Sequence, residues 1–131
     1  MDDDLSGAAP FVVIADDDPG ILRLIEVTLK RAGYDVAAVS DGESALRLIR
    51  ERRPDLVLLD VSMPIRTGLE VGKELQADEG LRDLPIVFLT AHSQESDVLE
   101  GFRSGAVDYL FKPFSPRELR ARVRGLLARP K

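Results

Sequence analysis

Four apolar runs of strand length, each followed by a polar or charged side chain, constrain the fold of this sequence most strongly. The runs are residues 11–15 before Asp16, 56–59 before Asp60, 86–89 before Thr90 and 107–111 before Lys112. Nearly continuous apolar runs are typical of parallel strands that are buried on both faces of a sheet. Because the carboxyl ends of parallel strands meet at one edge, where open α/β sheets bind ligands, we expect these acids, the hydroxyl and the amine to lie together.

Stretches with a helical period separate the apolar runs, and this alternation predicts βαβ units and a parallel sheet. Asp18 and Pro19 provide a cap and a favourable first residue for the first helix, and Gly33 predicts where that helix stops. A short strand is then predicted over residues 35–39. The chain therefore begins with a strand, a helix and a second strand.

The later helices have start signals of the same kind. Ser40 or Asp41 is expected to cap the second helix, with Glu43 completing a capping box from Ser40. Pro54 closes that helix. Further helices are predicted over about 68–77, about 94–103 and 116–127. The prediction is five strands and five helices in strict alternation.

The composition describes one globular domain, since 131 residues with an apolar fraction of 44% can bury a substantial core. The net charge of −5 argues against a surface for duplex DNA, whose binding depends on Lys and Arg that neutralise phosphates. The absence of cysteine excludes disulfides and cysteine-ligated metals and suits a cytoplasmic location. We expect residues 1–10 to be a disordered acidic lead-in and residues 11–128 to form the domain.

The residues at the four strand ends match a known family in order and in type. The matching motifs are Asp16-Asp17, then Asp60 with Met63-Pro64 and Gly68, then Thr90-Ala91, then Lys112-Pro113-Phe114. From about Phe11 to Leu127 the chain resembles a response-regulator receiver domain of bacterial two-component signalling, a member of the CheY-like superfamily. This resemblance implies an α/β, flavodoxin-like (βα)5 fold, with a doubly wound parallel sheet of five strands in the order 2-1-3-4-5.

The resemblance also implies a role for each acid. Asp60 matches the phosphoacceptor, since a carboxylate can act as a nucleophile and form an aspartyl-phosphate. Asp16, Asp17, Asp60 and the backbone carbonyl of Ser62 match the ligands of a Mg²⁺ ion, for which Mn²⁺ is an alternative. Such an ion would neutralise the negative charge that gathers when a phosphoryl group approaches carboxylates. We expect Asp17 to bind the ion directly and Asp16 partly through water.

Lys112 and Thr90 match the residues that contact the phosphoryl group in this family. Lys112 would donate to a phosphoryl oxygen. The Lys112–Pro113 bond is expected to be cis, because proline lowers the free-energy cost of a cis peptide bond. Thr90 would bond the phosphoryl group and trigger the conformational change. Ser62 and His92 lie where side chains of the family influence water access, so we expect them to modulate hydrolysis.

The output of the switch is expected on one face of the domain. Tyr109 matches the aromatic switch residue, and the phosphoryl charge would bias a two-state equilibrium around it. The face consists of the helix 94–103, the strand 107–111 and the helix 116–127. Asp108, Glu118 and Arg122 fit the charges of a phosphorylation-dependent homodimer through this face. Val98, Arg103 and Val107 do not supply the other charges that such a dimer usually has at their positions.

Together these residues predict a function for the chain. The chain would accept a phosphoryl group from a sensor histidine kinase, a histidine phosphotransfer protein or a small acyl phosphate, and lose it by self-catalysed hydrolysis. It would therefore not be a conventional enzyme. Its downstream partner would be an effector domain or a target protein, with no direct nucleic-acid contact and no membrane insertion.

Three other functions remain as alternatives. An aspartate-nucleophile phosphatase would use the same strand-end Asp with Mg²⁺, but it requires Asp-x-Asp, and here Ser62 stands in place of the second acid. A flavin-binding module would need a first loop rich in hydroxyls and glycine instead of Asp16-Asp17-Asp18. A pure interaction domain with an inactive site is disfavoured by the complete residue set.

Overall fold

The computed structural model describes residues 9–91 and 107–128, which form a five-stranded parallel sheet flanked by helices. The strands are β1 (Phe11–Ala15), β2 (Asp35–Val39), β3 (Leu56–Asp60), β4 (Ile86–Thr90) and β5 (Val107–Phe111), and the helices are α1 (Pro19–Arg31), α2 (Gly42–Arg52), α3 (Gly68–Ala77) and α5 (Pro116–Leu127). The strand order β2-β1-β3-β4-β5 confirms the predicted fold. The helix predicted over 94–103 lies outside the described residues. No helix within 9–91 or 107–128 is long and apolar enough to cross a membrane.

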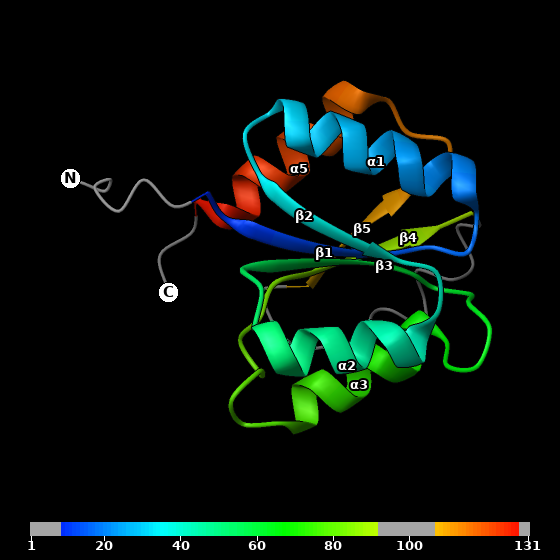
Figure 1. Ribbon diagram of the computed structural model, residues 1–131, viewed down its shortest axis with the longest axis vertical. Coiled ribbons are helices and arrows are strands. Elements are labelled where there is room, and N and C mark those ends of the chain that lie inside the picture. Colours follow the sequence, from blue (N-terminus) through cyan, green and yellow to red (C-terminus); the bar gives the residue numbers. More distant parts are fainter. Residues whose placement is uncertain (1–8, 92–106, 129–131) are drawn as a thin grey trace.

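The helices form two layers that cover opposite faces of the sheet. Figure 1 shows α1 and α5 on one face and α2 and α3 on the other. Alternate residues of β1 supply the two cores, since Val12 and Ile14 pack towards α1 and α5 while Val13 and Ala15 pack towards α2 and α3. This division follows from the two-residue period of side chains along a strand.

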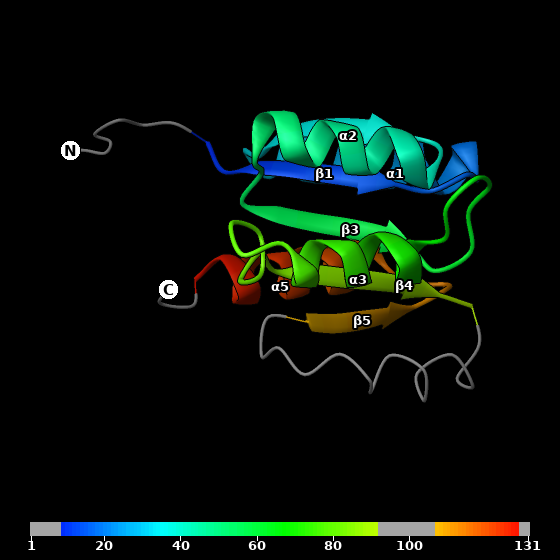
Figure 2. The same cartoon turned by 90° about the horizontal axis from the view of Figure 1, so that it is seen from below.

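Strand β3 lies in the middle of the sheet and is buried along its whole length. It pairs in parallel with β1 on one side and with β4 on the other (Figure 2). The registers place Ala15 beside Leu59 and Asp60 beside Leu89. The residues that follow β1, β3 and β4 therefore emerge at the same edge of the sheet, with Asp60 between the other two strand ends.

The helix starts confirm two predicted caps and correct one predicted capping box. Asp18 caps α1, where its Oδ1 accepts hydrogen bonds from the backbone N–H groups of Gly20 and Ile21. At α2 the cap is Asp41, one of the two predicted candidates, whereas the capping box predicted from Ser40 to Glu43 is wrong. The Asp41 carboxylate accepts from the Ser44 backbone N–H at 2.7 Å. The Glu43 side chain takes no part in capping and instead forms an ion pair with Arg66.

Candidate functional site

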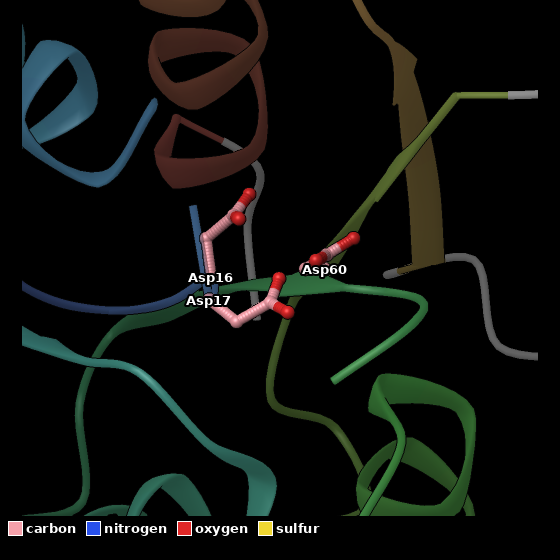
Figure 3. A group of neighbouring side chains, drawn as sticks. All are labelled: Asp16, Asp17 and Asp60. Atoms are coloured by element: carbon pink, nitrogen blue, oxygen red, sulfur yellow. The ribbon is translucent and has the colours of Figure 1, made fainter. Parts of the chain in front are cut away.

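Three carboxylates gather at the carboxyl edge of the sheet. Asp16 and Asp17 follow β1, and Asp60 ends β3. One carboxylate oxygen from each of the three lies within 4.8 Å of the others. Figure 3 shows the side chains leaving these two neighbouring strand ends. The convergence expected from the strand pattern is therefore present for all three acids.

Lys112 supplies the positive charge of this cluster. Its Nζ lies 2.9 Å from Asp16 Oδ2 and 3.4 Å from Asp60 Oδ1. The loop after β5 is tied to the end of β4, because the Lys112 backbone N–H donates to the Thr90 carbonyl at 2.8 Å. The Lys112–Pro113 peptide bond is cis, as expected. Lys112 and Thr90 are thus placed at the same edge as the acids.

Burial gives the three acids different surroundings. Asp16 is completely buried, Asp60 is 7% exposed, and Asp17 lies open to solvent. The Oδ1 atom of Asp16 accepts a hydrogen bond from the Asp18 backbone N–H at 2.9 Å. The Asp16 charge is held inside the protein by this bond and by the Lys112 ammonium, while Asp17 presents its carboxylate outward.

The crowding of negative charge perturbs the acid and the base in the same direction. Burial, the Asp16 charge and the contact with the Asp17 carboxyl raise the pKa of Asp60 to about 7, although Lys112 opposes this shift. Burial alone would lower the pKa of Lys112, but its ion pairs with Asp16 and Asp60 prevail and raise that pKa. The three acids therefore repel one another, and Lys112 compensates their negative charge only in part.

This crowding predicts an unusual dependence of stability on pH. Because the pKa of Asp60 rises from 3.8 to about 7 on folding, the native protein retains a proton that the unfolded chain has released between these values. The free energy of unfolding in EDTA should therefore fall as pH rises through this window, by roughly 2–4 kcal/mol. Urea unfolding at pH 5 and pH 8 measures the change.

Asp60→Asn is the control for this prediction, because it removes the titrating group while keeping the side-chain shape. The variant should be more stable than the parent at pH 8 and similar to it at pH 5. The difference between the two proteins cancels contributions from Asp41 and Glu70, whose hydrogen bonds to Ser44 and Thr67 lower their pKa values. An identical pH slope in both proteins would contradict the assignment to Asp60.

The loop after β3, residues 61–67, starts beside the acids. The Ser62 backbone N–H donates to Asp60 Oδ1 over 3.4 Å, and the Ser62 side chain is exposed. Gly68 closes the loop, with its N–H donating to the Val61 carbonyl. A Cβ at position 68 would lie 2.0 Å from the Asp60 carbonyl oxygen, so a side chain there would displace the strand end. This close approach gives a physical reason for the glycine in the motif.

The donor set fits a hard divalent cation. Mg²⁺ binds through carboxylate and carbonyl oxygens and keeps several waters, and the cluster offers three carboxylates with one open to solvent. The raised pKa of Asp60 is a second sign of fit, because a bound cation would relieve the repulsion that causes it. Asp16, Asp17 and Asp60 could hold such an ion. The division into direct and water-mediated ligands, and the Ser62 carbonyl as a ligand, stay predictions.

Thr90 lies at the same sheet edge as the acids, whereas the other predicted switch and output residues lie on β5 and α5 or beyond the described region. Tyr109 on β5 is 37% exposed, and its ring meets that of Phe111 edge to face at 5.1 Å. Asp108 and Arg122, expected as dimer charges, are ion-paired with each other at 3.0 Å. His92 lies outside the described residues, as do Val98 and Arg103. No sequence pattern predicted the contact between Tyr109 and Phe111.

Comparisons with known proteins agree on one family. The sequence profile of the response regulator receiver domain matches residues 12–124. The DNA-binding response regulator MtrA of Mycolicibacterium smegmatis is 47% identical over 118 residues, which are 90% of this chain and 50% of that protein. The chain thus spans about half the length of this relative.

Solved structures agree with this match. The chemotaxis response regulator CheY4 of Vibrio cholerae has a TM-score of 0.83 at 32% identity, covering 91% of this chain and 99% of its own. The receiver domain of the sensor histidine kinase PA1611 from Pseudomonas aeruginosa has a TM-score of 0.83 at 31% identity, covering 93% of this chain and 100% of its own. In that structure a magnesium ion is coordinated in the active-site cleft.

Proposed function

The chain belongs to the response regulator receiver domain family of two-component signalling, and we propose that it is a phosphoacceptor switch in which Asp60 receives the phosphoryl group. One observation carries this proposal more than any other. A strand-end carboxylate lies within 4.8 Å of two further acids and 3.4 Å from a half-buried lysine. That combination supports a nucleophile, a cation site and a counter-charge around one position.

In the proposed reaction, an Asp60 carboxylate oxygen attacks the phosphorus of a phosphohistidine or an acyl phosphate. A P–O bond to Asp60 forms, and the P–N or P–O bond of the donor breaks, with the electron pair leaving on imidazole or carboxylate. When bound, Mg²⁺ supplies charge neutralisation for this transfer. Attack by water later releases inorganic phosphate and restores Asp60. The chain thus catalyses only its own modification and is not a conventional enzyme.

Lys112 and Thr90 would contact the new phosphoryl group. Lys112 already sits between two carboxylates, so it could exchange one of these partners for a phosphoryl oxygen. Thr90 ends the neighbouring strand and is buried, so a change in its contacts would act on the interior. We propose that Tyr109, which is partly exposed, responds to this change on the face that includes β5 and α5.

We propose that a phosphoryl donor and a downstream partner bind two different surfaces of the domain. The donor would be a sensor histidine kinase or a histidine phosphotransfer protein. An apolar recess lined by Ile21, Leu24, Pro113 and Phe114 adjoins Lys112. We propose that the phosphoryl donor docks on this recess. An effector domain or a target protein would read the face around Tyr109, with homodimerisation on phosphorylation as one form of output. The cytoplasmic location expected from the sequence remains part of the proposal.

The direct test is phosphorylation by a small donor. Incubation with acetyl phosphate and Mg²⁺ should add one phosphoryl group per chain, because a single nucleophile has both cation site and counter-charge. With EDTA in place of Mg²⁺, the adduct should fall by at least about 10-fold, since the repulsion between anions is no longer neutralised. Intact-mass spectrometry measures both. No adduct with Mg²⁺, or equal adduct in EDTA, would overturn the proposal.

A further inference from the structure

Arg66, in the loop 61–67, joins the two helices that cover one face of the sheet. Its Nε lies 2.6 Å from Glu43 Oε1 on α2, and its Nη1 pairs with Glu74 Oε2 on α3. The other oxygen of Glu74 faces Arg50 of α2 at 3.6 Å. We call Glu43, Arg50, Arg66 and Glu74 the Arg66 network. A guanidinium suits this place because its planar fork can serve two carboxylates at once.

The residue before Arg66 has a strained backbone. Ile65 has a φ of 70°, in the left-handed region, and its side chain is 77% exposed. A β-branched residue rarely adopts this conformation, and it persists only when the surrounding structure enforces it. The exposed side chain of Ile65 provides little burial to enforce it. The enforcing contacts must come from the neighbouring residues of the loop.

Two anchors hold the loop on either side of Ile65. Met63 is buried in the core between the sheet and the helices α2 and α3. On the other side, the Arg66 side chain is fixed by its two carboxylates, and its backbone N–H donates to the Pro64 carbonyl at 2.7 Å. The Arg66 carbonyl also packs against α2, since a Cβ on Gly42 would lie 2.0 Å from it. The strained turn is thus held between two fixed points.

The same loop borders the carboxylate cluster. Ser62 donates its backbone N–H to Asp60, and Gly68 at the far end packs against the Asp60 carbonyl. If the anchor at Arg66 were released, Ile65 could relax to a negative φ, and the path from Ser62 to Gly68 would change with it. The orientation of the Asp60 carboxylate and of the Ser62 peptide depends on that path.

We propose that Arg66 is a positioning residue for the divalent-cation site, holding the strained loop 61–67 so that Asp60 and the Ser62 peptide keep the arrangement that binds the ion. This inference rests on the proposed function, because it concerns the same cation site. Arg66 does not touch the acids, and it acts through the loop. Its effect should therefore appear as weaker ion binding in a folded protein.

The test compares two substitutions in the same network. Arg66→Met removes the anchor, and it should weaken Mg²⁺ binding about 3- to 10-fold, less than the loss typical of residues bonded directly to metal ligands. Arg50→Met removes a member of the network whose ion pair is with Glu74 on α3, and it should leave Mg²⁺ affinity within about twofold of the parent. Isothermal titration calorimetry measures both affinities, with circular dichroism to verify folding.

A rescue separates positioning from a general loss of structure. Glycine adopts a positive φ without strain, so Ile65→Gly removes the need for an enforcing anchor. In Arg66→Met, the added Ile65→Gly should return Mg²⁺ affinity to within about twofold of the parent. Unchanged affinity in Arg66→Met, an equal loss in Arg50→Met, or no rescue would overturn the inference alone. Absence of Mg²⁺ binding in the parent would overturn the proposed function as well.

Discussion

Asp60→Asn should reduce the phosphoryl adduct formed with acetyl phosphate and Mg²⁺ by at least about 100-fold, as expected when the nucleophile itself is removed. An amide has no anionic oxygen to attack phosphorus, and it is a poorer ligand for a hard cation. The variant should fold, because it relieves the repulsion that raises the pKa of Asp60. Intact-mass spectrometry of parent and variant under the same conditions measures the ratio.

Asp18→Asn is a matched control for this substitution. Asp18 is an exposed acid two residues from Asp16, and its role is to cap α1. Asparagine caps a helix as well as aspartate does, so this variant should stay folded and keep its adduct. Loss of the adduct in Asp18→Asn would indicate that phosphorylation depends on the overall negative charge of this region and not on Asp60 in particular. Adduct in Asp60→Asn at more than about a tenth of the parent level would instead point to another acid, such as Asp17.

The strands and the convergence at the sheet edge could be predicted because they depend on local patterns. Runs such as 56–59 report burial on both faces, and the topology of a parallel sheet then brings the strand ends together. The convergence of Asp16, Asp60 and Lys112 followed from position, and the family resemblance singled out Asp17. Their electrostatic coupling could not be predicted, because the pKa of Asp60 depends on burial and on distances that only the fold defines.

The loop 61–67 shows what local patterns do not contain. Arg66 pairs with Glu43, 23 positions away, and with Glu74, 8 positions away, and neither spacing belongs to a helix or a strand. A left-handed backbone is usually predicted from glycine or asparagine. The positive φ of Ile65 could therefore not be predicted from its residue type. The choice between Ser40 and Asp41 as cap likewise depends on which of two adjacent residues precedes the first turn.

Lys112→Met should lower the free energy of unfolding in EDTA by about 2–4 kcal/mol, slightly less than the ~3–5 kcal/mol for breaking a fully buried ion pair, because Lys112 is only half-buried. The Lys112 ammonium lies 2.9 Å from the completely buried Asp16, and no other lysine or arginine within 9–91 or 107–128 is paired with that acid. The raised pKa of Lys112 means that this stabilisation is fully present below the lysine's unfolded value of 10.5, including neutral pH. Without the lysine, Asp60 can take up a proton more readily, and this uptake keeps the loss of stability from being larger. Urea unfolding at pH 7.5 measures it.

Mg²⁺ should reverse much of this loss, which distinguishes an electrostatic role from simple packing. In the parent, the ammonium occupies Asp16 and Asp60, so an incoming cation must compete with it. In Lys112→Met this competitor is gone, and saturating Mg²⁺ should stabilise the variant more than the parent, by at least about 1 kcal/mol. Lys73→Met, at an exposed lysine on α3, should change stability by less than about 0.5 kcal/mol with or without Mg²⁺. An equal deficit for Lys112→Met in EDTA and in Mg²⁺ would mean that its methylene chain, rather than its charge, supports the site.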